Sequence, residues 1–218
     1  MYNDVYMKKV LITGGMGFIG KFLTRKILRD TDYQIIIVDS LVASVEKDEI
    51  ISHDRVTFIQ SDLDHWQPPV GELYDQIYHL ASPVGPVRVL KFAGRMSGII
   101  VSHLEKMANI AIATKAKLMF MSTSELYGDV LEVPQNEDTP FNPQSPYAIG
   151  KLFSYMIGKN YRQSHKMFFV NGVLFNHESP RRGINFVTRK ISRGIGEILS
   201  KKISHITVGN IYAKRDWG

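Results

Sequence analysis

A tyrosine and a lysine in the second half of the sequence could do acid–base chemistry together. Tyr147 and Lys151 stand four residues apart in YAIGK, which places both on one face of a helix. A tyrosine at its reference pKa of about 10 is a poor base at neutral pH, but a neighbouring ammonium and a positive nicotinamide ring both favour the phenolate. Tyr147 could then take a proton from a substrate hydroxyl as a hydride leaves the same carbon.

A glycine-rich turn near the N-terminus could hold the dinucleotide that such chemistry needs. Gly14, Gly17 and Gly20 of TGGMGFIG follow an apolar run and open an amphipathic stretch, so the main chain and a helix N-terminus can approach a pyrophosphate. Asp39 follows about 20 residues later and ends the next apolar run, where a carboxylate accepts both ribose hydroxyls of NAD and repels a 2′-phosphate. The sequence therefore predicts NAD rather than NADP.

Asp62, in QSDLDH, is a candidate for the adenine edge of the same dinucleotide. Each of these features also has a plainer interpretation, namely a βα turn without a ligand for the glycines and a cap or turn residue for either aspartate. The complete predicted cofactor site comprises Gly14, Gly17, Phe18, Ile19, Gly20, Asp39, Asp62, Leu63, Leu80, Ala81, Tyr147 and Lys151.

The elements that must position these residues alternate between apolar β-branched runs and helical stretches. Runs this uniformly apolar are buried on both faces, which predicts a Rossmann-type, doubly wound parallel α/β sheet. We expect strands at 10–13, 35–39, 56–60, 76–81, 118–122, 168–175 and 205–209, and helices at 17–30, 97–115, 147–163 and 185–200.

The composition limits the classes of function. The 218 residues are 44% hydrophobic and include no cysteine, which excludes disulfides, thiolate metal sites and a thiol nucleophile. No apolar run approaches the roughly 20 residues of a membrane span, and no secretory signal is evident, so we expect a cytoplasmic protein without a membrane partner.

The net charge of +6 would suit a polyanion or a phosphorylated small molecule. Since nucleic-acid-binding signatures are absent, no nucleic-acid partner is predicted. The histidines lack metal-ligand spacing, so no metal is predicted.

The motifs TGGMGFIG, HLAS, STSELYG and YAIGK resemble the extended short-chain dehydrogenase/reductase family of nucleotide-sugar epimerases, dehydratases and decarboxylases, over essentially the whole chain. The resemblance implies that C4 of a sugar is oxidised by bound NAD. It also implies that Glu125 removes the C5 proton and so starts loss of the C6 hydroxyl; a solvated loop acid is the alternative. The implied catalytic residues are Thr123, Ser124, Glu125, Tyr147 and Lys151.

The second half, VNGVLFNHESPRRGINFVTRKISRGI with VGNIYAKRDWG, resembles the GDP-mannose 4,6-dehydratases. This implies a lyase acting on GDP-mannose or a related GDP-sugar, bound by Asn176, Val187, Lys190 and Arg215. Arg181 and Arg182 lie in a loop that in this family approaches the cofactor or a neighbouring subunit, whereas His177 is interpreted as structural. Asp39 and HLASPVGP resemble instead the UDP-glucuronate decarboxylases. A decarboxylase, a 4-epimerase or a 4-dehydrogenase therefore remains the alternative, and a non-enzymatic NAD-binding protein is the weakest one.

The expected organisation is an NAD-binding domain over residues 1–175, followed at 176–218 by the beginning of a smaller C-terminal substrate-binding domain, which we expect to be truncated. By the same resemblance we expect a homodimer or homotetramer built on the helices at 97–115 and 147–163. The apolar residues that could serve that contact are Ile99, Ile100, Met107, Phe153 and Met156.

Overall fold

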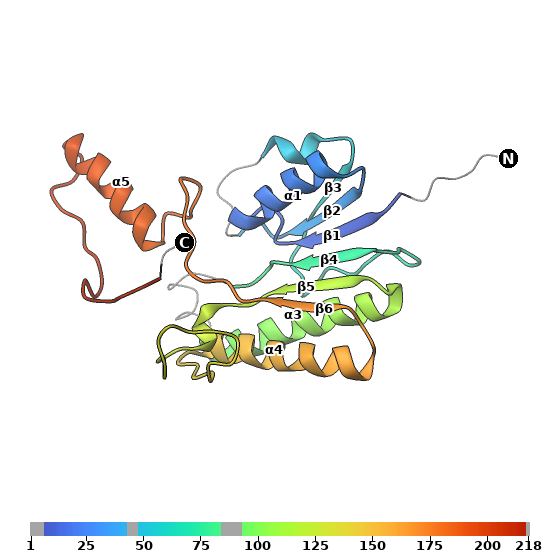
Figure 1. Cartoon of the computed structure of the whole chain (residues 1–218). Coiled ribbons are helices and arrows are strands. Elements are labelled where there is room, and N and C mark those ends of the chain that lie inside the picture. The colour runs from blue at the N-terminus through green and yellow to red at the C-terminus, as the bar shows by residue number, and fades with distance from the viewer. Residues whose placement is uncertain (1–6, 43–47, 84–92, 217–218) are drawn as a thin grey trace.

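The computed structural model describes residues 7–42, 48–83 and 93–216, and its centre is a six-stranded parallel sheet (Figure 1). The strand order is β3-β2-β1-β4-β5-β6. Successive strands are therefore added to one side of β1 up to β3 and to its other side from β4 onward. This confirms the predicted Rossmann-type α/β class. The strands are β1 (Lys9–Thr13), β2 (Gln34–Asp39), β3 (Val56–Gln60), β4 (Gln76–His79), β5 (Lys117–Met121) and β6 (Phe169–Gly172).

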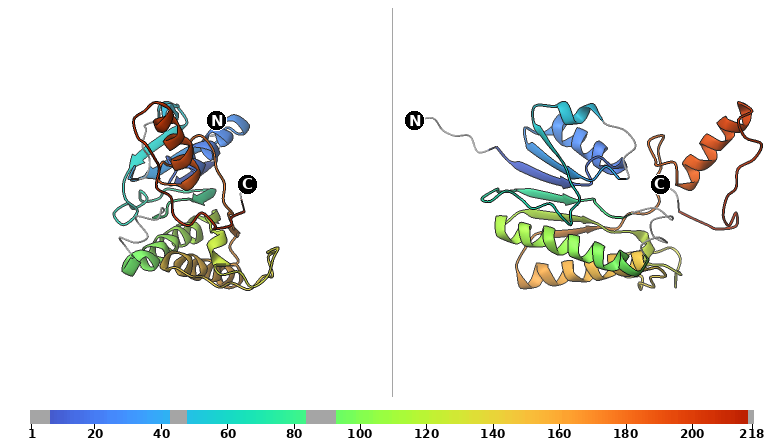
Figure 2. Two further views of the ribbon diagram at one scale, coloured as in Figure 1. Left: turned by 90° about the vertical axis from the view of Figure 1, so that its left-hand side faces the viewer. Right: turned by 180° about the vertical axis from the view of Figure 1, so that it is seen from behind.

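Helices cover both faces of the sheet. In the two further views, α1 lies on one face together with the short helix η1, while α3 and α4 lie side by side on the other face (Figure 2). The helices are α1 (Phe18–Asp30), η1 (Glu49–Ser52), α3 (Ala93–Thr114), η2 (Ser124–Leu126), α4 (Pro146–Ser164) and α5 (Val187–Leu199). The ends of α1, α4 and α5 lie close to those expected from the sequence, whereas η1 and η2 were not expected and the strand expected at 168–175 ends at Gly172.

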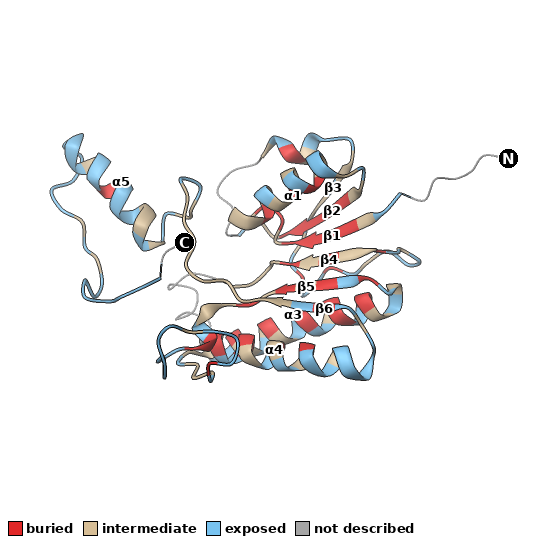
Figure 3. Cartoon of the chain, viewed as in Figure 1, coloured by how far each residue is buried: buried red, intermediate tan, exposed pale blue. Residues whose placement is uncertain are grey.

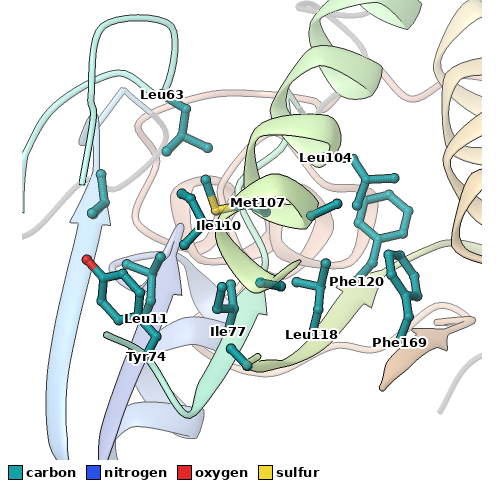
Figure 4. Packing of buried hydrophobic residues seen from close by; sticks show 14 of the residues in the cluster. Leu11, Leu63, Tyr74, Ile77, Leu104, Met107, Ile110, Leu118, Phe120 and Phe169 are labelled. Atoms are coloured by element: carbon teal, nitrogen blue, oxygen red, sulfur yellow. The ribbon is translucent and has the colours of Figure 1, made fainter. Parts of the chain in front are cut away.

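Alternate residues of the strands feed two separate cores, which explains why the runs are apolar at nearly every position. Leu11, Ile77 and Phe120 point toward α3, where they meet Leu104 and Met107 (Figure 4). The opposite face of the central strands packs against α1, through residues that include Val10, Ile12, Ile35, Ile37 and, from the helix, Ile27.

The strand predicted at 205–209 is wrong, because these residues form no strand in the structure. The segment instead packs onto α5, and the side chain of Ile206 fills the place that a side chain at Gly194 would occupy. Its β-branched residues therefore serve a contact with a helix. β propensity cannot distinguish such a contact from strand pairing.

Two residues predicted for a subunit interface are also corrected. Ile100 and Met107 are buried between α3 and the sheet, so they belong to the core of this chain. Phe153 and Met156 on α4 are each about half exposed, and Ile99 is partly exposed, so these three stay available to a partner.

α5 lies apart from the sheet, beyond the carboxyl ends of the strands, and is largely exposed (Figure 3). Its apolar side chains recur every three or four residues, which is the pattern of an amphipathic helix. Val187, Ile191, Ile195 and Ile198 along this stripe are all more than one third exposed. Within the described ranges, neither α5 nor another helix has the length and apolar character needed to cross a membrane.

The structure predicts that replacing glycine with alanine has opposite effects on stability at two positions, Gly158 and Gly98. A side chain at Gly158 on α4 would overlap the ring of Phe169, whereas a side chain at Gly98 on α3 would meet nothing within 4 Å. Gly158→Ala should therefore lower the free energy of unfolding by about 1–3 kcal/mol through overpacking. Gly98→Ala should raise it by up to about 1 kcal/mol through helix propensity. Urea unfolding of both variants checks this, and equal effects of the two would contradict the packing described.

Candidate active site

The glycine-rich turn lies where β1 meets β4 at the carboxyl edge of the sheet. Gly14 has a φ of 71°, a region that favours glycine, and its N–H donates to the Val38 carbonyl at 2.8 Å. A Cβ at Gly14 would lie 2.7 Å from the backbone nitrogen of Ala81, and one at Gly20 would lie 2.5 Å from the Gly14 oxygen. Glycine is therefore required at both positions for the turn to pack.

Asp39 at the end of β2 braces this turn. Its two carboxylate oxygens accept hydrogen bonds from the backbone N–H groups of Met16, at 2.9 Å, and Leu41, at 2.8 Å. The side chain is nearly buried beside the turn. Each carboxylate oxygen has a further lone pair, so these bonds leave Asp39 able to accept from a ligand hydroxyl as well.

A buried polar pair joins the ends of β1 and β4. Thr13 Oγ1 lies 2.7 Å from His79 Nδ1, and the Ala81 N–H reaches the same hydroxyl at 3.4 Å. Burial, and to a lesser degree Lys151 and His103, hold the pKa of His79 well below its usual range. The neutral imidazole therefore acts as a hydrogen-bonding link at the centre of the sheet.

The short helix η2 is separated from β5 by two residues and carries Ser124 and Glu125. Thr123 caps this helix and accepts the Glu125 N–H at 3.2 Å, while the Ser124 N–H donates to the Leu174 carbonyl at 2.8 Å. Gly128 ends the segment with a φ of 52° and packs directly against the Asn142 carbonyl, which leaves no room for a side chain. Backbone contacts on both sides thus fix the direction in which Glu125 is presented.

Tyr147 and Lys151 lie on the first turns of α4. Ser145 caps the helix by accepting the Ala148 N–H at 3.1 Å. Lys151 Nζ donates to the Met121 carbonyl at 2.7 Å and lies 5.7 Å from the centroid of the Tyr147 ring. The predicted placement of the pair on one helix face therefore holds, and the lysine is also tied to the end of β5.

Burial dominates the electrostatics of this pair. Burial is the main reason that the pKa of Tyr147 is raised to about 12; a hydrogen bond with Thr123 opposes this rise and nearby Glu125 adds to it. Burial also lowers the pKa of Lys151 to about 7. The expectation that a charged lysine favours the phenolate therefore needs a qualification, because in the protein alone burial disfavours the charged form of both groups.

A cavity of about 830 Å³ connects these parts. All five predicted catalytic residues and all four predicted substrate residues line it, and so do five of the predicted cofactor residues outside α4: Gly14, Phe18, Ile19, Gly20 and Leu80. Gly17, Asp39 and Ala81 are absent from the lining, although each lies in or against the glycine turn. The Val84–Pro86 part of the HLASPVGP motif lies outside the described residues.

Asp62 and Leu63 are also absent from the lining of this cavity. Leu63 is buried in the core beneath α3, and Asp62 is exposed. Asp62, Asp64 and His103 bring three potential metal-ligand atoms within 4.8 Å of one another. However, His103 Nε2 and Asp64 Oδ1 already form a 2.8 Å hydrogen bond.

The segment after β6 closes the cavity opposite α1. His177 stacks on Phe18, with ring centroids 5.7 Å apart, and the Arg182 guanidinium lies 3.6 Å from the Phe186 ring centroid and 5.7 Å from that of Phe18. His177, Arg182 and Phe186 all line the cavity. The sequence predicts a structural role for His177 and gives no indication that Phe186 lies at the cavity. Their spacing carries no signal, because contacts distant along the chain bring them to α1.

Comparisons with known proteins point to one family. A family model described as GDP-mannose 4,6 dehydratase matches residues 11–218. The GDP-mannose 4,6 dehydratase of Dictyostelium discoideum is 36% identical over 97% of this chain and 64% of its own length. GDP-mannose 4,6 dehydratase 2 of Caenorhabditis elegans is 55% identical over 49% of this chain and 28% of its own length. The chain thus covers less than two thirds of the length of these curated relatives.

Solved structures share the fold. A UDP-N-acetylglucosamine 4-epimerase from Methanobrevibacter ruminantium M1, in complex with UDP-N-acetylmuramic acid, matches 98% of this chain and 69% of its own chain, with a TM-score of 0.82 and 25% identity. DesIV, a dTDP-glucose 4,6-dehydratase from Streptomyces venezuelae with NAD and TYD bound, matches 88% of this chain and 62% of its own, with a TM-score of 0.75 and 22% identity.

The depressed pKa of Lys151 predicts a pH-dependent stability. Between about pH 7 and 10.5 the unfolded chain holds a proton on Lys151 that the folded chain lacks, so the free energy of unfolding rises with pH across this window. Lys151→Met removes this contribution. The stability of the wild type relative to Lys151→Met should therefore increase from pH 7 to pH 10 in urea unfolding. Lys159→Met, at an exposed position of the same helix, is the control and should show no such trend.

Proposed function

The chain belongs to the GDP-mannose 4,6-dehydratase family, and from that premise we propose that it acts on a GDP-sugar by C4 oxidation with bound NAD and loss of water across C5 and C6. One observation carries the proposal. A single cavity holds Glu125, Tyr147 and Lys151 from the chemistry-bearing elements together with Lys190 and Arg215 from the C-terminal segment. Two proposed proton acceptors, Tyr147 and Glu125, thus share one space with cations that could bind phosphate.

The residues present fit a dinucleotide at the glycine turn. Gly17 precedes α1 without a side-chain cap, so N–H groups of the first turn stay open to a pyrophosphate, and Phe18, Ile19 and Gly20 border the cavity there. Asp39 would accept the ribose hydroxyls, and Arg182 would add positive charge near the helix end. When bound, NAD would supply the electron acceptor for oxidation at C4 of the sugar.

Tyr147 is the proposed base for the C4 hydroxyl. Its pKa of about 12 in the protein alone keeps it protonated at neutral pH, so little phenolate is present to accept a proton. A positive nicotinamide and a protonated Lys151 would both favour its phenolate once ligands fill the cavity. Thr123, which shares a hydrogen bond with Tyr147, would orient the same hydroxyl, and Ser124 lies beside it on η2.

Glu125 is the proposed base for the C5 proton. It is exposed at the cavity wall, and it is close enough to Tyr147 to affect the tyrosine pKa. A ketone at C4 would acidify C5, so Glu125 would take the C5 proton. The protonated Glu125 would then return this proton to the C6 oxygen, which would leave as water while the C5–C6 double bond forms. A simple 4-epimerase needs no such group, and this favours the dehydratase over that alternative.

The C-terminal segment would hold the nucleotide diphosphate. Lys190 on α5 and Arg215 near the chain end are exposed cations at the cavity, and charge-assisted hydrogen bonds to phosphate oxygens suit both. Asn176 Nδ2 donates to the Asp216 carbonyl at 2.9 Å, which ties the last residues of the segment to its start.

We also propose that residues 176–218 begin a substrate-binding region. A further proposal is that Phe153 and Met156 serve a homodimer contact.

Asp39 should set the preference between the two dinucleotides. Asp39→Asn keeps an acceptor for one of the two backbone N–H groups but removes the negative charge that would repel a 2′-phosphate. The ratio of the dissociation constants for NADP and NAD should therefore fall in the variant. Titration with both dinucleotides measures the ratio, and equal binding of NAD and NADP by the wild type would contradict the placement of Asp39 on the ribose.

Tyr147 and Glu125 should fail at different steps with GDP-mannose. Tyr147→Phe removes the base for C4 oxidation, so absorbance at 340 nm should not rise. Glu125→Gln cannot take the C5 proton, so the 4-ketone and reduced cofactor should accumulate as a 340 nm signal. In the wild type that signal would be hidden, because the hydride taken from C4 would be returned to C6 of the same sugar once water has left. Rapid-mixing absorbance on both variants, with NAD bound, is the measurement.

The mass of the wild-type product separates the alternatives, with a panel of GDP- and UDP-sugars as substrates. Loss of water supports the dehydratase, whereas loss of carbon dioxide or an unchanged mass would mean a decarboxylase or an epimerase. Wild-type turnover by Glu125→Gln would also overturn the dehydratase proposal. Retained activity in both variants would mean that the site itself is misplaced.

A further inference from the structure

Two phenylalanines on α1 face the segment that closes the cavity. The rings of Phe18 and Phe22 lie one helical turn apart, with centroids separated by 5.8 Å and planes at 81°. Phe18 lines the cavity, whereas Phe22 lies outside it and is 48% exposed. An aromatic side chain half exposed on the rim of a cavity is a ready partner for a cation.

Two adjacent arginines of the closing segment use these rings differently. Arg182 turns inward, where it lines the cavity between Phe18 and Phe186. Arg181 turns outward, and its guanidinium carbon lies 5.5 Å from the centroid of the Phe22 ring. It is absent from the cavity lining, and it contacts the outer rim of the side that α1 forms.

Arg181 also lies close to the carboxylate of Asp48, whose position is fixed by other contacts. Its Nη1 lies 3.9 Å from Asp48 Oδ2. Asp48 caps η1 by accepting the Ile50 N–H, and Arg25 from α1 pairs with both of its carboxylate oxygens, at 2.7 and 2.8 Å. Burial raises the pKa of Asp48, but the bonds from Ile50 and Arg25 outweigh it and hold the pKa below its usual value. The Asp48 carboxylate is therefore ionised at neutral pH and is held in one position.

These contacts join the segment after β6 to α1 and to the N-terminal cap of η1. α1 and η1 supply Phe22 and Asp48, and a segment more than 130 residues further along the chain supplies Arg181. The backbone around Arg181 is itself ordered by a turn, since Ser179 Oγ accepts the Arg181 N–H at 3.0 Å and the Ser179 carbonyl accepts the Arg182 N–H at 2.9 Å. Movement of the segment away from α1 would break the Arg181 contacts, together with those that His177 and Arg182 make with Phe18.

We propose that Arg181, Phe22 and Asp48 form a latch that holds the 176–186 segment against α1 and slows the release of the dinucleotide from the cavity. The inference rests on the proposed function, because it takes the dinucleotide as the occupant. Neither Arg181 nor Phe22 lines the cavity, so the latch would act on the rate of escape and leave the groups that contact the ligand in place. A retained dinucleotide suits a reaction that returns its electrons to the same substrate.

Dissociation of NADH from the full chain tests the latch. The protein is loaded with NADH and mixed with excess NAD, and the loss of NADH fluorescence gives the dissociation rate. Arg181→Ala and Phe22→Leu should each raise this rate by about two- to fivefold, the size expected of one cation–π contact. The double variant should be no faster than the faster single variant, because both changes open the same latch. Arg181→Lys keeps the charge near Asp48 but stacks less well, so its rate should lie between those of the wild type and Arg181→Ala.

Arg29→Ala is the matched control. Arg29 is an exposed cation on α1 that pairs with its neighbour Asp30, away from the cavity. Its loss changes the net charge by the same amount and should leave the dissociation rate unchanged. Wild-type rates in either latch variant, or additive effects in the double variant, would overturn the latch while leaving NAD binding intact. Failure of the wild type itself to bind NADH would overturn the proposed cofactor, and the latch with it.

Discussion

The approach of the glycine turn to the backbone after β4 is the constraint on which the rest of the structure depends. β1 pairs with β2 on one side and with β4 on the other, so the chain leaving β1 must pass directly over the end of β4. Only a residue without a side chain can do so at Gly14, where Ala81 lies within contact distance of the backbone. That passage opens the crevice at the switch point of the sheet, and the cavity lies there as the general rule for such sheets expects.

The polar side chains at this crevice lie against the hydrophobic core, and burial therefore governs their charge states. Lys151 and His79 are both held toward their neutral forms, and Tyr147 is held toward the protonated phenol. The protein alone is thus an electrostatically incomplete site. Cationic and anionic groups of the ligands would supply the missing counter-charges, so the catalytic groups would become active together with binding.

Features set by local spacing could be predicted from the sequence, and features set by distant packing could not. The glycine turn, Asp39 at a strand end, and the helical pair of Tyr147 and Lys151 are all local patterns, and the structure places each as expected. Gly15 was missed because its role depends on β2, where a side chain would meet Ile37 at 2.6 Å. Likewise, the apolar period of α3 could not reveal that Ile100 and Met107 face the sheet rather than a partner.

The strand order also has a kinetic consequence. Thr13 and His79 are 66 positions apart yet hydrogen-bonded, and β6, which completes the sheet, pairs with β5 only after the whole of α4 has been made. Loops of this length must close before strand pairing can offset the entropy that closure costs, so this step is slow. Apolar strand edges therefore stay exposed for longer than in a helical bundle. We therefore expect the crevice to be among the last parts of the molecule to form during synthesis, so that a partly folded chain cannot yet bind the dinucleotide.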